Sequence, residues 1–206
     1  MKKLITLCVS VLLLAAVLQS WAMKESSNAE KDCCTTMNVA SFNLRMDTPN
    51  DGVNAWPNRK EMVKGLIRFH DFDLFGTQEG FKHMLDGICE LDGYAYIGAG
   101  RDDGEEAGEH SAIFYKTNRF EVLDKGNFWF SETPGVPGKG WDVTCCNRIC
   151  SWGKFLDKES GKVFYFFNSH YDHQGKVARR ESSKLLLDKI RKIAGDKACL
   201  LYTSPS

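Results

Sequence analysis

Short apolar runs that alternate with helix-like segments constrain the fold of this chain more than any other feature. Residues 37–45 (MNVASFNLR) and 73–79 (DLFGTQE) are typical of buried strands, and a helix-like segment follows each of them. Later runs at 120–130, 147–156 and 163–170 extend the β pattern, the last two as a hairpin. Local strand pairing combined with strand–helix alternation predicts an α/β fold: a two-layer mixed β-sandwich flanked by helices, in four layers (α/β/β/α).

The first helix is predicted to begin at Trp56. Pro57 then occupies a first-turn position, where proline is tolerated. Met62, Leu66 and Phe69 recur at helical spacing further along. We therefore expect these three side chains to share one face of the helix.

Two other helices and two shorter strands complete the predicted elements. A short helix is expected at 81–91 and a long one at 176–194, where Leu186, Ile190 and Ile193 form one apolar stripe. Two strands, at 94–99 and 111–115, flank an acidic loop that we expect to be mobile. Gly195 provides the signal that ends the long helix.

The N-terminal residues have the pattern of a targeting segment. Residues 1–22 combine two early lysines, an apolar run and the sequence Ser20-Trp21-Ala22, with small residues where a signal peptidase requires them. We predict a signal peptide cleaved after Ala22, a flexible lead-in at 23–36, and export to the periplasm or the extracellular space. An uncleaved membrane anchor is the alternative, although the apolar run is short for a bilayer.

The charge balance bears on the class of substrate. The chain has 27 basic and 27 acidic residues, and removal of Lys2 and Lys3 with the leader leaves a small net negative charge. Broad electrostatic capture of nucleic acid requires a basic face, so the composition does not favour it. A small phosphorylated substrate stays compatible with this balance, and we expect a monomer without a stable membrane anchor.

The cysteines do not have the spacing of a zinc knuckle. Export would permit disulfides, but the adjacent pairs Cys33-Cys34 and Cys145-Cys146 lack the two-residue spacer of zinc-binding motifs. Buried thiols or one disulfide are expected, with the pairing left open.

Polar residues at the ends of apolar runs are the candidates for chemistry. Asn43 and Glu79 each lie at the end of a predicted strand, and Asn168, His170 and Asp172 follow another. Alternate residues of a strand share a face, so the last three can point together. Taken singly, each has a commoner explanation: an Asn that caps a turn, a solvated Glu, or a His satisfied in a core.

Taken together with their surroundings, these residues resemble a known family. The matching segments are SFNLR around Asn43, GTQE ending in Glu79, GEHSAIFY at 108–115, NRICSWGKF at 147–155 and NSHYDHQGKVARRES at 168–182. In this order they resemble the endonuclease/exonuclease/phosphatase superfamily. The resemblance covers residues 37–198, which we expect to form the N-terminal part of such a domain.

The resemblance implies a role for each candidate. Asn43 and Glu79 match the positions that hold a divalent cation, usually Mg²⁺, with Mn²⁺ as a substitute. His170 matches the histidine that contacts the scissile phosphate, with Asn168 beside it. Arg148 matches an arginine near the site that either contacts phosphate or braces a loop through an ion pair. The implied activity is that of an exported Mg²⁺-dependent phosphoester hydrolase, a phosphodiesterase or a phosphomonoesterase. Glu109 and Tyr115 are weaker candidates.

The sequence departs from the family pattern near its end. The family has two further motifs, GDFN-like and SDH-like, which help to activate the attacking water, and neither follows. We interpret residues 199–206 (CLLYTSPS) as a non-native tail that resembles the translation of a transposon-adapter sequence. The alternative is a genuine short strand and tail. On the first interpretation the chain is a fragment, which we expect to be inactive and poorly stable by itself.

Two other functions remain open. A zinc metallohydrolase would use His170, Asp172 and His173, although strand alternation places the two histidines on opposite faces. A non-catalytic secreted binding module would use exposed aromatics. The candidates for that role are Trp56, Trp129, Trp141 and Trp152.

Overall fold

The computed structural model describes residues 36–195 and 200–203. The predicted signal peptide, nearly all of the predicted lead-in and part of the predicted tail lie outside the described residues. Within the described part of the chain, no helix has both the length and the apolar character needed to cross a membrane.

One four-stranded sheet is mixed. Its strand order is β1-β2-β4-β3. β1 (Val39–Asn43) pairs in parallel with β2 (Leu74–Gln78), whereas β4 (Ile113–Lys116) is antiparallel both to β2 and to β3 (Tyr94–Ile97). Parallel pairing brings the carboxyl ends of β1 and β2 to the same edge, where Asn43 lies opposite Gln78.

The second sheet is also mixed, with the order β5-β6-β7-β8. β5 (Phe120–Trp129), β6 (Ile149–Asp157) and β7 (Val163–Ser169) are antiparallel neighbours, and β8 (Leu200–Thr203) pairs in parallel with β7. The predicted β6–β7 hairpin is therefore confirmed.

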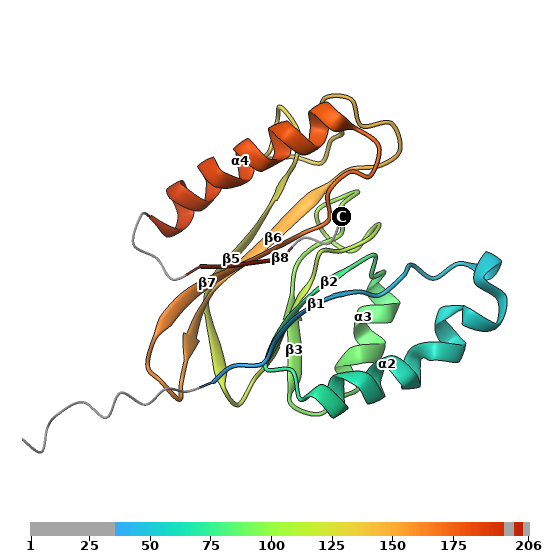
Figure 1. The fold of residues 1–206 in the computed structure, drawn as a ribbon, viewed down its shortest axis with the longest axis vertical. Helices are drawn as coiled ribbons and strands as arrows, with labels where there is room; N and C mark the ends of the chain where they lie inside the picture. Colours follow the sequence, from blue (N-terminus) through green and yellow to red (C-terminus); the bar gives the residue numbers. More distant parts are fainter. Residues whose placement is uncertain (1–35, 196–199, 204–206) are drawn as a thin grey trace, which may run out of the picture. The chain divides into compact units, whose positions relative to one another are not determined.

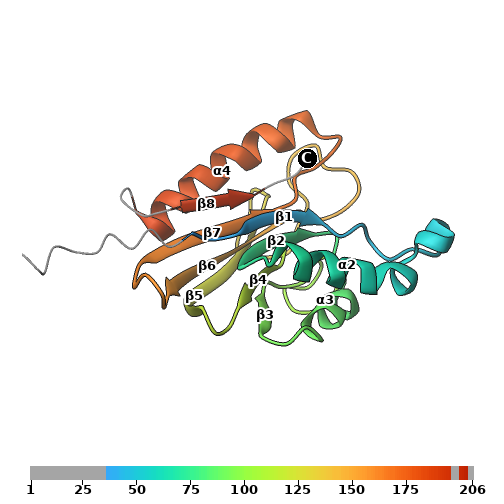
Figure 2. The same cartoon turned by 60° about the horizontal axis from the view of Figure 1, so that its bottom comes forward.

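The helices cover the outer faces of the two sheets. A 3₁₀ helix (Pro49–Asn54) precedes α2 (Trp56–His70), and α3 (Lys82–Cys89) follows β2. α2 and α3 lie on the first sheet, and α4 (Lys176–Ala194) lies along the second (Figures 1 and 2). The predicted α/β/β/α architecture is confirmed.

Three apolar clusters fill the three interfaces between these layers. Successive side chains of a strand point to opposite faces of the sheet, so neighbouring residues belong to different clusters. Leu74 belongs to the cluster between the sheets, whereas its neighbour Phe75 packs beneath α2 and α3. In the second sheet, Phe166 faces the inter-sheet cluster and Phe167 faces the cluster beneath α4. Leu186 is buried in that third cluster, with Ile190 and Ile193 packed against it, as the predicted stripe requires.

The residues expected to share one face of α2 do not form the face that the helix buries. Met62 and Phe69 are 69% and 84% exposed, whereas Val63 and Ile67 are buried. Both sets of residues have helical spacing, so periodicity does not distinguish them. Contact with the first sheet determines which face of α2 is buried, because Val63 and Ile67 pack in the cluster that contains Phe75.

Candidate active site

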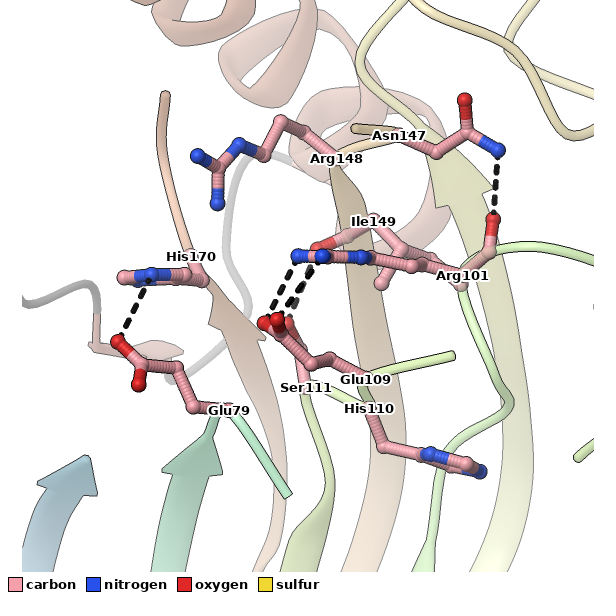
Figure 3. A pocket seen from close by; sticks show the side chains of 9 residues that line it. All are labelled: Glu79, Arg101, Glu109, His110, Ser111, Asn147, Arg148, Ile149 and His170. Carbon is pink, nitrogen blue, oxygen red and sulfur yellow. Dashed lines mark hydrogen bonds and ion pairs between the residues drawn. The ribbon is translucent and has the colours of Figure 1, made fainter. Parts of the chain in front are cut away.

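A small polar pocket lies at the end of the sandwich where β2 and β7 terminate (Figure 3). Its cavity of about 10 Å³ has space for about one water molecule. The lining residues come from both sheets and from the loops beside them: Glu79, Arg101, Glu109, His110, Ser111, Asn147, Arg148, Ile149 and His170.

Asn43 and Glu79 contact each other at this edge. Asn43 Nδ2 donates to Glu79 Oε1 at 2.8 Å, and the Met46 N–H donates to Glu79 Oε2 at 3.1 Å. The Arg45 N–H donates to Asn43 Oδ1 at 2.8 Å. The loop after β1 therefore fixes both polar groups, and the structure brings together the two residues that sequence resemblance assigns to a cation.

Two backbone positions beside the pocket lie in the left-handed region. Arg45 has φ of 55° and Glu79 has φ of 61°. Residues other than glycine rarely adopt this conformation, at a cost of roughly 1–3 kcal/mol, and such residues concentrate at functional sites. The backbone at Glu79 turns out of β2 at the position where its carboxylate enters the pocket.

Glu79 carries a negative charge at neutral pH in this environment. Burial alone would raise the pKa of its carboxyl group, but the hydrogen bonds from Asn43 and Met46 and the nearby charges of His170 and Arg45 together hold that pKa below its ordinary value. An ionised carboxylate next to an amide oxygen is a donor set that Mg²⁺ prefers. Asn43 and Glu79 therefore fit a hard divalent cation, with water to complete its coordination.

His170 approaches Glu79 from the other sheet. It directly follows β7, and its Nε2 lies 3.6 Å from Glu79 Oε1 (Figure 3). Its side chain is 19% exposed, so it is accessible from the pocket. The structure thus joins His170 to the Asn43–Glu79 pair, although 91 positions separate His170 from Glu79 in the sequence.

Arg148 lines the pocket but is engaged in an ion pair. Its Nε and Nη2 donate to Asp172 Oδ2 at 3.3 and 3.2 Å, and Nη2 lies 3.1 Å from His173 Nδ1. Both side chains of the Arg148–Asp172 pair are nearly fully buried. Asp172 Oδ1 accepts from the N–H groups of Gln174 and Gly175, so the pair fixes the loop that follows His170.

Asn168 is fully buried between the two sheets, although sequence resemblance places it beside the phosphate. Its Nδ2 donates to the carbonyl oxygens of Thr77 and Ala112, each at 2.8 Å. Its Oδ1 accepts from Gln78 Nε2 at 2.7 Å. The amide of Asn168 is thus bonded to the first sheet beneath the pocket.

A buried ion pair that the sequence did not predict forms one wall of the pocket. Arg101 Nη1 and Nη2 donate to the two carboxylate oxygens of Glu109 at 2.8 and 2.9 Å. Burial raises the pKa of Glu109 above its ordinary value, and the charge of Arg101 only partly offsets this effect. Trp129 and Asn147 both donate to the Arg101 carbonyl oxygen, which anchors the start of the acidic loop. Glu109 was only a weak candidate in the sequence analysis. Nothing in the sequence marked Arg101 as a site residue except its position at the start of the acidic loop.

One other cluster contains residue types that bind metals. The ligand atoms of Cys145, Asp172 and His173 lie within 4.8 Å of one another. Arg148 contacts all three, with Nη2 at 3.9 Å from Cys145 Sγ. A guanidinium cation thus already neutralises this cluster. His170 lies with Glu79 instead, so His170, Asp172 and His173 do not converge as a zinc site would require.

The tryptophans that could serve a binding module are mainly structural. Trp56 and Trp129 are buried, and Trp152 stacks on Phe167 with ring centroids 6.3 Å apart. Trp141 packs against the cluster beneath α4. In the described chain, these four side chains contribute chiefly to packing.

The cysteines in the described part of the chain are free thiols. Cys150 is buried, Cys89 and Cys146 are half-buried, and Cys145 is exposed. Burial raises the pKa of Cys146 to about 11, with a further increase from the neighbouring Cys145.

Comparisons with known proteins agree with this fold. The structure of a mannosyl-6-phosphatase from Bacteroides thetaiotaomicron is 48% identical, with a TM-score of 0.79, and the match covers 82% of this chain and 64% of that one. An endonuclease/exonuclease/phosphatase from Bacteroides vulgatus is 41% identical, with a TM-score of 0.79 and coverage of 82% and 65%. An uncharacterized protein of Acanthamoeba polyphaga mimivirus is 31% identical over 173 residues, which are 80% of this chain and 62% of that protein. No family model matches.

A four-layer sandwich with Asn, Glu and His converging at one end of its sheets defines the class of protein. The chain belongs to the endonuclease/exonuclease/phosphatase superfamily. It spans less than two thirds of the length of the relatives named above.

Proposed function

We propose that the full-length protein is an exported, divalent-metal-dependent phosphoester hydrolase that acts on a sugar phosphomonoester. The convergence of Asn43, Glu79 and His170 carries this proposal. Asn43 ends β1, Glu79 directly follows β2 and His170 directly follows β7. Glu79 Oε1 accepts from Asn43 Nδ2 at 2.8 Å and lies 3.6 Å from His170 Nε2. Export rests on the N-terminal leader pattern.

The residues divide the chemistry between two sides of the pocket. Asn43 and Glu79 would hold Mg²⁺ or Mn²⁺, which neutralises charge on the phosphoryl oxygens during attack by water. His170 Nε2 faces the same space and, when protonated, donates a hydrogen bond to a phosphoryl oxygen. The Arg148–Asp172 pair holds the loop that follows His170, because Asp172 also accepts from the N–H groups of Gln174 and Gly175.

The charges around the pocket favour a small substrate over nucleic acid. Two arginines line the pocket, and each is paired with a carboxylate. The pairs are Arg101–Glu109 at 2.8 Å and Arg148–Asp172 at 3.2 Å. A phosphate backbone is held by cations that are available to several successive phosphates. Paired arginines suit one phosphate group held mainly by a metal ion.

The choice of a sugar phosphate rests on the Bacteroides thetaiotaomicron relative. That protein is described as a mannosyl-6-phosphatase and is 48% identical over the shared region. The exposed Glu105 and Glu106, in the loop between the pocket residues Arg101 and Glu109, would offer acceptors for sugar hydroxyl groups.

The test is a substrate panel with the full-length protein. Mannose 6-phosphate, glucose 6-phosphate, bis(p-nitrophenyl) phosphate and single-stranded DNA are compared with Mg²⁺, with Mn²⁺ and with EDTA. We expect metal-dependent release of phosphate, fastest from a hexose 6-phosphate. Glu79→Gln and His170→Ala should each lose at least about 100-fold in kcat, whereas Glu121→Gln and His70→Ala, at exposed positions, should not.

Two results would contradict the proposal. Turnover that persists in EDTA would remove the metal from the mechanism. Preferential cleavage of DNA or of the diester would replace the sugar phosphomonoester with another substrate class.

A further inference from the structure

A layer of polar side chains lies directly beneath the pocket, between the two sheets. Gln78 Nε2 donates to Asn168 Oδ1 at 2.7 Å and lies 3.4 Å from Ser41 Oγ. Ser41 belongs to β1, Gln78 to β2 and Asn168 to β7. This polar layer therefore connects three strands, two in the first sheet and one in the second.

Each member of the polar layer is next to a residue of the proposed site. Ser41 precedes Asn43 by two positions on β1, so both share a face. Gln78 immediately precedes Glu79, and Asn168 precedes His170 by two positions. Each member of the layer thus precedes a residue of the proposed site by one or two positions.

Both polar atoms of the Asn168 side-chain amide, Nδ2 and Oδ1, form hydrogen bonds in this layer. Both N–H groups of Nδ2 are directed at carbonyl oxygens of the first sheet, those of Thr77 and Ala112. This contact fixes the amide orientation, so Oδ1 must face Gln78 as an acceptor. Asn168 is 0% exposed, and contact with a substrate would break these hydrogen bonds.

The hydrogen bonds of this layer lie next to an apolar region between the two sheets. Below the polar layer the inter-sheet space is apolar and contains Leu74, Ile113 and Phe166. A buried donor or acceptor without a partner is destabilising, so the network favours one arrangement of the two sheets at this level. A hydrophobic contact at the same place would not specify that arrangement as sharply.

We propose that Asn168 is a positioning residue: through Gln78 it sets the separation between Glu79 on one sheet and His170 on the other. The role rests on the proposed function, because those two residues must act on one phosphate. An error of about 1 Å in such a separation can cost about 100-fold in rate.

The test compares variants of the full-length protein. Asn168→Ser, Gln78→Ala and the double variant are assayed for kcat and KM with the best phosphomonoester of the panel, well below the unfolding temperature. We expect Asn168→Ser to lower kcat about 100-fold and Gln78→Ala about 10-fold, with KM changed less than about threefold. The double variant should resemble Asn168→Ser alone, because both changes break one network.

A destabilised control separates positioning from loss of stability. Asp73 at the other end of β2 forms a cross-sheet ion pair with Arg119 at 2.8 Å. Asp73→Asn should lower the melting temperature as Asn168→Ser does but leave kcat within about twofold of the wild type. Crystal structures of the Asn168→Ser and Asp73→Asn proteins supply a readout independent of activity. The distance from His170 Nε2 to Glu79 Oε1, 3.6 Å here, should lengthen only in the former.

Three results would overturn the proposal. The first is a Gln78→Ala protein with wild-type kcat, the second is effects that add in the double variant, and the third is an unchanged distance in Asn168→Ser. A wild-type protein that hydrolyses no phosphoester would refute the proposed function instead. The crystallographic distance would still report whether Asn168 positions His170.

Discussion

Asn43 Nδ2 and Glu79 Oε1 are joined by a hydrogen bond of 2.8 Å between the ends of two parallel strands. The bond orients the carboxylate and also lowers the pKa of Glu79. Because the register places Asn43 opposite Gln78, the residue before Glu79, the pair depends on one strand register. A slip by one residue would separate the two groups.

Asn43→Ala should weaken the cation site without unfolding the protein. It removes one oxygen ligand and the donor that orients Glu79, and loss of such support typically costs 10–100-fold in metal affinity. Titration with Mn²⁺ followed by electron paramagnetic resonance measures this affinity directly. Asn58→Ala, at an exposed position on α2, is the matched control. Equal Mn²⁺ affinity in the wild-type and Asn43→Ala proteins would assign the cation to other residues.

Arg148→Ala should lower the free energy of unfolding by about 3–5 kcal/mol, because it leaves the buried Asp172 without its cation. Chemical denaturation measures this change. Arg180→Ala removes an arginine that is 65% exposed and should change the value by less than about 0.5 kcal/mol. Similar small effects in both variants would show that the ion pair does not brace the loop after His170.

Acid should destabilise the far end of the sandwich through Asp157. Burial alone would raise the pKa of this carboxyl group, but hydrogen bonds from Arg119, Ser160 and the Glu159 N–H hold it below its ordinary value. The unfolded chain therefore binds the proton more tightly. The resulting stabilisation is complete above the unfolded pKa of about 3.9 and is lost as pH falls through the lower folded pKa.

Asp157→Asn should accordingly be less stable than the wild type at pH 7, by roughly 1–3 kcal/mol, and should lose less stability between pH 5 and pH 2. Urea unfolding at a series of pH values measures both effects. The matched control is Asp188→Asn, at a side chain that is 62% exposed. Parallel pH curves for the wild-type and Asp157→Asn proteins would be the contrary outcome.

The thiols should differ sharply in reactivity. Cys145 is exposed, whereas burial raises the pKa of Cys150 well above its ordinary value and that of Cys146 to about 11. Because the thiolate is the reactive form, iodoacetamide at pH 8 should modify Cys145 before Cys146, and Cys150 only after denaturation. Peptide mass spectrometry follows each site, with Cys145→Ser as the control. Rapid labelling of Cys150 in the folded protein would contradict its burial.

The two faces of α2 should respond differently to truncation. Ile67→Ala removes a fully buried side chain and should cost about 2–5 kcal/mol of unfolding free energy. Phe69→Ala removes a larger side chain that is 84% exposed and should cost less than about 0.5 kcal/mol. Thermal denaturation ranks the two variants, and a larger loss for Phe69→Ala would contradict the burial of Ile67 and the exposure of Phe69.

The α2 result illustrates what sequence patterns can and cannot determine. The bounds of α4 and the presence of strands leading to Asn43 and Glu79 follow from local spacing, so they were predictable. The buried face of α2 was not, because two sets of residues satisfy the same periodicity and only the sheet selects between them.

The candidate site was also predictable from the sequence only in part. His170 was found through a motif, but the partners of Asn168 lie 56 to 91 positions away and no local pattern indicates them. The Arg101–Glu109 pair depends on how one loop closes on itself, which composition does not reveal.

The inter-sheet location of the pocket also affects how the protein becomes active during folding. Asn43 and Glu79 are delivered by one sheet and His170 by the other, so an intermediate with a single formed sheet has no complete pocket. Contacts between such distant segments form late and slowly. The complete pocket should therefore form only in the final, cooperative step of folding, when the two sheets pack together.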